Sequence, residues 1–264
     1  MGEPTWSVVA GDGPLVATAI HDGHLIRGEL RDRCALTEAE RLREEDPFTG
    51  EWTTVAGTRV VARRSRFEVD LNRPRERAVY LEPDDAWGLK VWREPLTPGM
   101  VERSLSFHDS YYAELKQLLK KKVDRHGRFV LFDLHSYNHR RSGPEGPPAA
   151  PEENPEVNIG TGNLDRGLWA PVVDAFRSAL GGFDFGGRHL DVRENVKFRG
   201  GYLSKWVQQE FPGVGCALAI EFKKFFMDEW TGDPVPETVE AIHQALASTV
   251  SPVLTALARM DSAA

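Results

Sequence analysis

The chain has 264 residues, a formal net charge of −7, and hydrophobic and charged fractions of 41% and 28%. These fractions are those of an ordinary globular protein, and the length suits a single α/β domain with a large core. The acidic balance argues against a general affinity for nucleic acid or for an anionic membrane, so an anionic ligand would have to be drawn in by a local cluster of arginines.

The bulk features also indicate where such a protein works. No apolar stretch approaches the length of a membrane span, and the N-terminus lacks the charged-then-apolar pattern of a signal peptide. The two cysteines, Cys34 and Cys216, lie far apart and outside any CxxC motif, which is typical of free thiols in a reducing compartment. We therefore expect a cytoplasmic protein with no nucleic-acid or membrane partner.

The first expected element is a buried strand over residues 16–20, which are all apolar or β-branched. This strand runs directly into the sequence His21-Asp22-Gly23-His24. Two imidazoles three residues apart therefore leave the end of a buried strand, where a metal or a substrate could be bound.

The next segment should contain a short helix and a hairpin. The helix is expected to start near Thr37, because Thr37 and Glu40 have the spacing of a capping box, and Asp46-Pro47 should close it. Residues 52–70 alternate in the manner of a β-hairpin around Ala56-Gly57.

An arginine-rich segment comes next. Arginine is suited to bidentate recognition of a carboxylate and to stabilising an oxyanion. We expect such a role for Arg66 and Arg73, whereas a solvated strand face is the fair interpretation of Arg63, Arg75 and Arg77. The interleaved acidic residues make a nucleic-acid patch a poor interpretation.

The middle of the chain predicts a long helix, a strand and a loop. Residues 100–122 repeat apolar side chains at helical spacing, and His108 lies on that apolar stripe as an expected core residue. The strand over residues 129–134 ends in His135-Ser136. Residues 142–158 are rich in Pro, Gly and Glu and predict an exposed loop, which is either a lid or a disordered insertion.

Two more amphipathic helices are expected in the C-terminal third. The first carries apolar residues from Leu164 to Leu180, and Gly181-Gly182 should end it. The second starts near Pro236, and Pro252 should kink or break it.

Between these helices lie two segments with chemical interest. In Arg199-Gly200-Gly201-Tyr202, the two glycines would let the backbone approach a ligand closely, although a simple turn is equally compatible with the spacing. The apolar strand over residues 217–220 then runs into Glu221.

Apolar strands that alternate with amphipathic helices predict an α/β fold. We expect a single three-layer domain over residues 1–264, with a mixed, mostly parallel sheet and helices on both faces. In such sheets the working site lies at the carboxyl ends of the strands. His21, His135 and Glu221 each follow a strand, so all three should reach the same edge.

Three histidines at strand ends match the ligands of a catalytic zinc ion. Such an ion takes three protein ligands and leaves a position open for water. Here the short-spaced pair would be His21 and His24, and the distant ligand would be His135, while Asp22 could orient a ligating imidazole. The alternative is that these histidines are ordinary polar residues at strand ends.

Glu221 follows an apolar run and would be largely buried. A buried carboxylate is costly unless it is paired, so a strand interior is an unfavourable place for it. Near a metal it could take a proton from water and pass it to a leaving amine. The alternative is a core salt bridge, for example with Lys223 or with an arginine.

Taken in order, these landmarks resemble the N-formylglutamate amidohydrolase family, which is related to the zinc carboxypeptidases and to aspartoacylase. The resemblance implies a carboxypeptidase-like, phosphorylase/hydrolase-like fold. It rests on His21-Asp22-Gly23-His24, Val69-Asp70-Leu71-Asn72-Arg73-Pro74, Asp133-Leu134-His135-Ser136, Arg199-Gly200-Gly201-Tyr202 and the strand ending in Glu221.

The resemblance implies a role for each matching position. His21 and His135 match metal ligands, and Glu221 matches the general base. Asn72 and Arg73 match residues that hold a substrate carboxylate. In addition, Arg66 matches an arginine that polarises the scissile carbonyl, Tyr202 matches a substrate-facing tyrosine, and Arg199 matches a group for a second carboxylate.

One position departs from the wider group, because His24 stands where that group has a glutamate ligand. An imidazole can bind zinc, but it removes one negative charge from the site. The metal would then be more electrophilic, or another carboxylate such as Asp22 would compensate.

The implied activity is zinc-dependent hydrolysis of the amide bond in N-formyl-L-glutamate or a related N-acyl amino acid. The expected cofactor is therefore Zn²⁺, and the expected partner is a small-molecule N-acyl amino acid; a homo-oligomer is compatible with the sequence. The alternatives are a carboxypeptidase-like metallopeptidase with an open cleft, a non-catalytic metal- or ligand-binding relative, and an arginine-dependent anion-binding module without metal.

Overall fold

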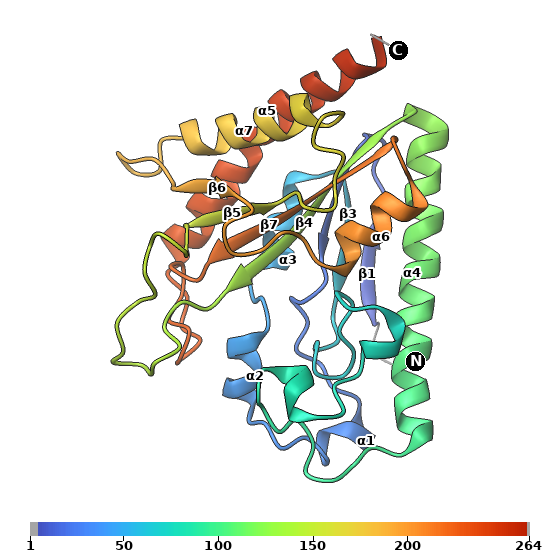
Figure 1. Ribbon diagram of the computed structural model, residues 1–264, viewed down its shortest axis with the longest axis vertical. Coiled ribbons are helices and arrows are strands. Elements are labelled where there is room, and N and C mark those ends of the chain that lie inside the picture. Colours follow the sequence, from blue (N-terminus) through green and yellow to red (C-terminus); the bar gives the residue numbers. More distant parts are fainter. Residues whose placement is uncertain (1–4, 263–264) are drawn as a thin grey trace.

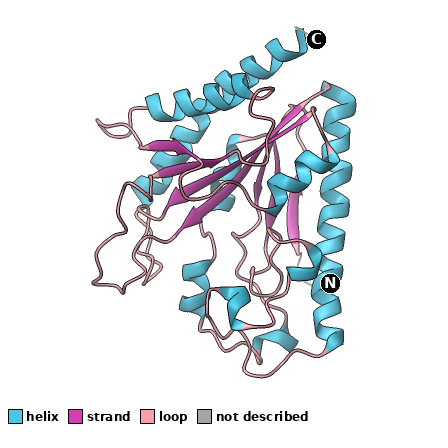
Figure 2. Ribbon diagram, in the orientation of Figure 1, coloured by secondary structure: helices cyan, strands magenta, loops and turns pink. Residues whose placement is uncertain are grey.

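A computed structural model describes residues 5–262, so the two ends of the expected domain over residues 1–264 lie outside the described residues. The described residues form one seven-stranded sheet with helices on both faces (Figures 1 and 2). The strands are β1 (Trp6–Val9), β2 (Leu15–Ala19), β3 (Thr58–Ala62), β4 (Phe129–Tyr137), β5 (Val157–Gly160), β6 (Val192–Glu194) and β7 (Gly215–Lys223).

The sheet is mixed and mostly parallel, which confirms the predicted fold class. Its strand order is β1-β3-β2-β4-β7-β5-β6. The central strands β3, β2, β4 and β7 are mutually parallel, β1 and β5 run antiparallel to their neighbours β3 and β7, and β6 runs parallel to β5. The carboxyl ends of four adjacent strands therefore meet at one edge.

Helices cover each face of the sheet. The α-helices are α1 (Gly28–Arg31), α2 (Glu38–Glu44), α3 (Thr49–Trp52), α4 (Pro98–His126), α5 (Ala170–Gly182), α6 (Tyr202–Glu210) and α7 (Pro236–Ser262), and the 3₁₀ helices are η1 (Thr53–Val55), η2 (Arg75–Arg77) and η3 (Pro83–Ala86). Strand β4 shows why both faces are covered, because its side chains alternate between two apolar cores. Val130 and Phe132 pack with α5 and α7, whereas Phe129 and Leu131 pack with α4 and α6.

The expected long helix and the short capped helix are both present. Helix α4 spans Pro98–His126, and its buried His108 shares a hydrogen bond with the backbone oxygen of Arg73. Helix α2 begins after Thr37, where Thr37 and Glu40 form the predicted capping box. The side-chain spacing was therefore sufficient to locate both helices.

Two predicted elements differ from the structure. Residues 52–70 do not form a hairpin, because β3 pairs with β2 and β1 instead of with a strand across Ala56-Gly57. Helix α5 starts at Ala170 and not at Leu164, because the Asp165 carboxylate accepts hydrogen bonds from two backbone amides of a turn. In the first case pairing with strands distant in sequence overrides the apolar pattern. In the second case a local turn does so.

The segment over residues 142–158 is a loop up to β5, which begins at Val157. Helix α7 continues through Pro252 as one helix. Residues 236–260 of this helix are long and apolar enough to cross a membrane by length and composition alone, contrary to the expectation that no stretch approaches a span. In the structure, Ile242, Leu246 and Val253 of α7 are buried in the core shared with α5.

Candidate functional site

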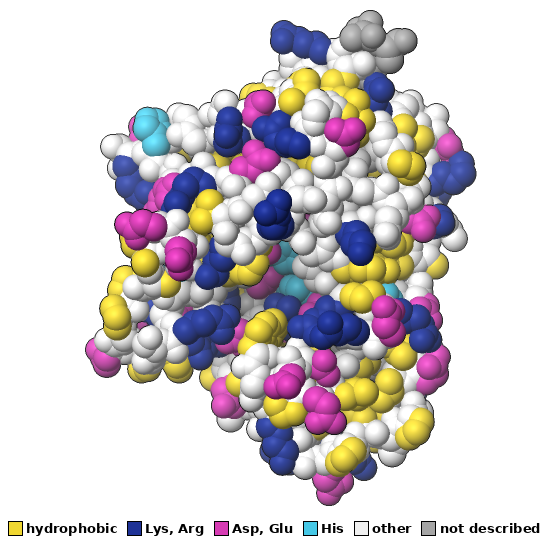
Figure 3. Space-filling view, viewed as in Figure 1, with side chains coloured by type: hydrophobic (Ala, Val, Ile, Leu, Met, Phe, Trp, Pro, Cys, Tyr) yellow, Lys and Arg dark blue, Asp and Glu magenta, His cyan; other side chains and the backbone are white. Residues whose placement is uncertain are grey.

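A cavity of about 350 Å³ opens at the carboxyl edge of the parallel strands. His21, which lies two residues beyond β2, lines it together with His135 of β4 and Glu221 of β7. His135 and Glu221 are directly paired in the register of the two strands. The prediction that these three side chains reach one edge is therefore correct, and Figure 3 shows histidine side chains at the bottom of a hollow with Lys and Arg side chains around it.

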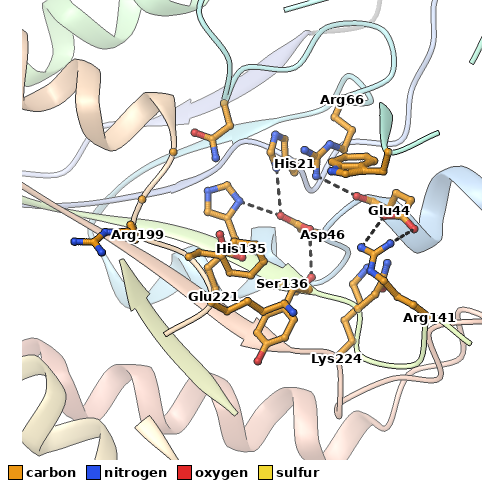
Figure 4. A pocket seen from close by; sticks show the side chains of 18 residues that line it. His21, Glu44, Asp46, Arg66, His135, Ser136, Arg141, Arg199, Glu221 and Lys224 are labelled. Atoms are coloured by element: carbon orange, nitrogen blue, oxygen red, sulfur yellow. Dashed lines mark hydrogen bonds and ion pairs between the residues drawn. The ribbon is translucent and has the colours of Figure 1, made fainter. Parts of the chain in front are cut away.

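A buried group of His21, Asp46 and His135 could hold a metal ion. The Oδ2 atom of Asp46 lies 3.0 Å from Nδ1 of His135 and 3.4 Å from Nδ1 of His21 (Figure 4). The Nδ1 atom of His21 is buried and has no hydrogen-bond partner in the described part of the chain. Two imidazole nitrogens and one carboxylate oxygen form a ligand set that zinc accepts.

Each of the two histidines is backed by a carboxylate on its other nitrogen. The Nε2 atom of His21 lies 2.7 Å from Oδ1 of Asp70, and Nε2 of His135 lies 3.0 Å from Oδ2 of Asp133. The His21–Asp70 contact is a hydrogen bond, which holds the proton on Nε2 and orients a metal-binding imidazole. The His135–Asp133 contact is an ion pair. The Nδ1 atoms of both histidines face the Asp46 carboxylate, so a cation between them would have all three side chains as ligands.

The charges around His135 also favour a cation. Burial alone would lower the pKa of His135, but Asp133, Glu221 and Asp46 together raise it well above its usual range. Burial alone would raise the pKa of Asp46, but the hydrogen bond with His135 and the nearby His21 imidazole hold it well below its usual range. The group thus concentrates negative charge around two imidazoles, and the residues fit a metal ion.

Asp70 connects the histidine group to the arginine-rich segment. Besides His21, its buried carboxylate binds the Arg66 guanidinium at 3.0 Å and accepts a hydrogen bond from the Tyr80 hydroxyl. Burial opposes the charge on Asp70, but Arg66 and His21 hold its pKa well below its usual range. Arg66 is therefore fixed beside the site by a charged hydrogen bond.

Glu221 is the one carboxylate in the cavity without a partner among the described residues. It has neither a hydrogen bond nor an ion pair there, and Lys223, the alternative partner, donates to the backbone oxygen of Asn154. Burial raises the pKa of Glu221 to about 7, with Asp46 adding to the rise and His135 opposing it. A carboxyl group with such a pKa can exchange a proton near neutral pH.

Six of the nine predicted site residues line this cavity: His21, Arg66, Asn72, His135, Arg199 and Glu221. Gly201 explains how Asn72 is placed, because a Cβ atom at position 201 would overlap the Asn72 amide. The Asn72 Oδ1 atom accepts a hydrogen bond from the Leu203 amide at 3.1 Å. The two glycines therefore let the backbone at residues 200–201 approach the Asn72 side chain. Gly200 also has a φ of +107°, a backbone conformation that favours glycine.

The structure does not bring His24 to the histidine group, and this corrects its expected place as a ligand. Its Nδ1 faces Glu45 and its Nε2 faces Arg41, and His24 does not line the cavity. Gly23 packs directly on the Arg63 backbone, where a side chain would overlap, so the turn leaves His21 and His24 on different sides. Asp22 is not a substitute either, because its carboxylate accepts a hydrogen bond from the Gly50 amide.

Asp46 is the third member of the buried group that could hold a metal ion. It lies two residues beyond α2, and its backbone amide donates to the His21 oxygen at 2.9 Å. The sequence holds a signal for it, because Glu45 and Asp46 form an acidic pair at the C-terminal end of a helix, where the dipole disfavours negative charge. Acidic residues in such a place call for partners elsewhere in the fold.

Arg73 and Tyr202 are the other two predicted residues that lie outside the cavity lining. The Arg73 guanidinium stacks 4.7 Å from the Tyr80 ring centroid, with its Nε 3.5 Å from Asp70. The Tyr202 ring packs 5.4 Å from the Tyr112 ring on α4. Both side chains are held by internal contacts that their motifs do not show.

The cavity also contains cations that sequence reasoning missed. Arg141 pairs with Glu44 at 3.3 Å, and Lys224 donates hydrogen bonds to the backbone oxygens of Arg43 and Glu45. Lys197 donates to Oδ1 of Asn154 at 2.6 Å, and no carboxylate of the described residues pairs with it. These cations come from loops, where no periodic pattern marks them.

A model of the N-formylglutamate amidohydrolase family matches residues 13–226 of the chain. The chain belongs to this family. A solved N-formylglutamate amidohydrolase from Ralstonia eutropha JMP134 has a similar fold, with a TM-score of 0.70 and 19% identity over 95% of this chain and 96% of that chain. A gene product of Agrobacterium tumefaciens has a TM-score of 0.65 and 16% identity over 94% of this chain and 95% of that chain. A search of curated protein sequences finds no significant match.

Membership of the N-formylglutamate amidohydrolase family confirms the resemblance seen in the sequence. The matched segment, residues 13–226, includes every residue of the His21–Asp46–His135 group and Glu221. The segment that matches the family model therefore contains the side chains that form the core of the cavity.

Proposed function

We propose that this protein is a zinc-dependent amidohydrolase that cleaves N-formyl-L-glutamate or a related N-acyl amino acid. The observation that carries the proposal is the unpartnered Glu221 carboxylate in the same cavity as the His21–Asp46–His135 group. Family membership supports an amidohydrolase reaction. A base beside a metal site is one arrangement that can hydrolyse an unactivated amide.

His21, Asp46 and His135 would hold the zinc ion. Three protein ligands leave a position for water or substrate, as in catalytic zinc sites. When bound, zinc polarises a carbonyl group and lowers the pKa of water. Asp70 and Asp133 keep the two imidazoles oriented from behind.

Glu221 would act as the general base and then as the general acid. Its carboxylate accepts a proton from the attacking water and later donates it to the leaving amine. Burial raises its pKa to about 7, so it can serve both steps near neutral pH. Its place on β7 beside His135 keeps it within the same cavity as the scissile bond.

The cationic and amide groups of the cavity would bind the rest of the substrate. Arg66, fixed by Asp70 and by the Glu44 backbone oxygen, is placed to stabilise the oxyanion. The Asn72 Nδ2 group has no acceptor among the described residues, so it can donate to the α-carboxylate. Lys197 and Arg199 have no carboxylate partner in the described chain, and they suit a second carboxylate.

The test is release of acid from a panel of amides by the purified protein. The panel contains N-formyl-L-glutamate, N-acetyl-L-glutamate, N-formyl-L-methionine and a short peptide with a free C-terminus. Each is assayed with the protein as isolated, after chelation, and after Zn²⁺ is returned. We expect N-formyl-L-glutamate or another N-acyl amino acid to be cleaved fastest, with activity lost on chelation and restored by zinc.

The other outcomes separate the alternatives. Faster cleavage of the peptide than of any N-acyl amino acid would favour a metallopeptidase. Tight metal binding with no hydrolysis of the panel would favour a non-catalytic relative. Full activity after complete removal of metal would contradict the zinc dependence.

A further inference from the structure

His24 is the residue of the His-Asp-Gly-His motif for which the proposed reaction has no use. Its ring nevertheless makes two hydrogen bonds: Nδ1 with the Glu45 carboxylate, and Nε2 with a guanidinium nitrogen of Arg41 at 3.2 Å. A guanidinium can only donate, so Nε2 accepts and the proton lies on Nδ1. His24 thus donates to Glu45 and is held in that orientation by Arg41.

Glu45 is fully buried, and its carboxylate is enclosed by donors. One oxygen faces His24, the other accepts a hydrogen bond from the Ser65 hydroxyl, and an Arg41 nitrogen lies 3.7 Å away. A buried carboxylate with this many partners has one orientation, because leaving a donor or acceptor unsatisfied is costly.

Glu45 lies directly before the proposed metal ligand Asp46. The backbone at Glu45 is extended, with φ −80° and ψ 173°, so the two side chains point to opposite sides. Glu45 faces the His24 cluster while Asp46 faces His21 and His135. The Glu45 backbone oxygen is held by the Lys224 ammonium at 2.6 Å.

We propose that His24 is a positioning residue for the metal site, a role that rests on the proposed function. By fixing the Glu45 carboxylate, it sets the backbone at residues 45–46 and thereby the direction of the Asp46 carboxylate. The first histidine of the motif acts on the metal directly, and the second acts on it through Glu45 and Asp46. Arg41, which also donates to the His24 backbone oxygen at 2.9 Å, ties the motif to helix α2.

A purely structural role for His24 makes a different prediction. In that case its loss would lower the stability of the fold but leave the metal affinity of the folded protein unchanged. A positioning role requires that the metal site itself changes. The two roles are therefore separated by measurements on the metal, and not by activity.

The experiment compares the wild type with His24→Ala, His24→Asn and His189→Ala. His189 is an exposed histidine outside the cavity lining and serves as the matched control. Each protein is stripped of metal, and its Zn²⁺ affinity is measured by competition with a chromophoric chelator. Co²⁺ is then added alone, because its visible absorption bands report the geometry of the ligands, and thermal unfolding of the metal-free protein is recorded.

We expect His24→Ala to weaken Zn²⁺ binding by about 10–100-fold, the range typical of residues that orient a ligand. The Co²⁺ bands should change in position or intensity. His24→Asn should recover most of the affinity, because its amide N–H can take the place of Nδ1–H toward Glu45. His189→Ala should match the wild type in both measurements.

Wild-type affinity and an unchanged Co²⁺ spectrum in His24→Ala would overturn the inference and leave the proposed metal site intact. If His24→Ala does not fold, His24→Asn and Ser65→Ala carry the test, and Ser65→Ala must then weaken Zn²⁺ binding. A wild type that binds neither ion overturns both proposals. A wild type that binds Zn²⁺, with the expected loss in His24→Ala but no hydrolysis of the amide panel, overturns the proposed activity alone.

Discussion

The two walls of the cavity differ in whether their charged side chains are paired with groups of opposite charge. On the buried wall, His21 is paired with Asp70 and His135 with Asp133, so that the histidines are held by the protein itself. On the open wall, Lys197 and Arg199 have no carboxylate partner among the described residues. The histidines of the buried wall therefore have charged partners before a substrate binds, whereas the cations of the open wall do not.

This difference indicates that the two walls have different roles in the proposed reaction. Charges buried without partners are costly, so the buried histidines are held by carboxylates, whereas burial raises the pKa of the unpartnered Glu221 to about 7. An exposed cation can keep its charge for a ligand, because water solvates it until the ligand arrives. We therefore expect changes to the buried wall to affect metal binding and turnover, and changes to the open wall to affect substrate affinity.

The largest expected effect is that of Glu221→Gln. The amide keeps the shape of the side chain but cannot accept the proton from water, so kcat should fall by about 10²–10⁴-fold. Zinc content should stay near that of the wild type, and the exposed Glu240→Gln is the matched control. Equal kcat in Glu221→Gln and the wild type would remove Glu221 from the mechanism.

Asp46→Ala should have the next largest effect, this time on the metal. Removing one of three ligands should weaken Zn²⁺ binding by more than about 100-fold, which exceeds the usual loss for a residue that only orients a ligand. Chelator competition measures this, with the exposed Asp84→Ala as control. A metal affinity unchanged by Asp46→Ala would show that the ligand set is a different one.

Lys197→Met tests the open wall. Loss of a hydrogen bond to a charged group should raise KM for N-formyl-L-glutamate about tenfold, with little change in kcat. KM for N-formyl-L-norvaline, which lacks the second carboxylate, should not change. Lys205→Met, on the exposed side of α6, is the control, and an equal rise in KM for both substrates would contradict the assignment.

The smallest expected effect concerns Asp22, which lies outside the cavity lining and whose carboxylate accepts a hydrogen bond from the Gly50 amide. Burial raises its pKa from 3.8 to about 6, so the folded state binds this proton more tightly than the unfolded state. Stability should therefore fall as the pH rises from about 4 to 6. Asp22→Asn should remove this loss and stabilise the metal-free protein at pH 8 by about 1–3 kcal/mol.

Thermal unfolding of both metal-free proteins at several pH values measures the Asp22 effect. The melting temperatures of wild type and variant should converge near pH 4 and differ at pH 8 by about 2–4 °C for each kcal/mol. Coinciding curves at every pH would show that Asp22 carries no such penalty.

Much of the site could be predicted because it depends on strand ends. His21, His135 and Glu221 follow apolar runs, and the parallel order of β2, β4 and β7 brings them together. Asp46 could not be placed this way, because it follows helix α2, and the position of that helix relative to the sheet depends on tertiary packing.

The corrections share one physical cause. His24 was expected at the metal because of its spacing from His21, but Gly23 turns it toward the buried Glu45. The expected hairpin failed for a similar reason, since β3 found its partners in β1 and β2. Spacing along the chain predicts which residues can be neighbours, whereas the choice between competing partners depends on contacts between distant segments.

The pairing of His135 with Glu221 across β4 and β7 has a consequence for how robust the site is. Neighbouring strands are held about 4.8 Å apart by their backbone hydrogen bonds, whatever their side chains are. The spacing between the proposed ligand His135 and the proposed base Glu221 is thus set by the backbone hydrogen bonds between the two strands. Core substitutions under the helices should make the protein easier to unfold long before they change that spacing, and only a slip of strand register would turn one of the two side chains to the other face of the sheet.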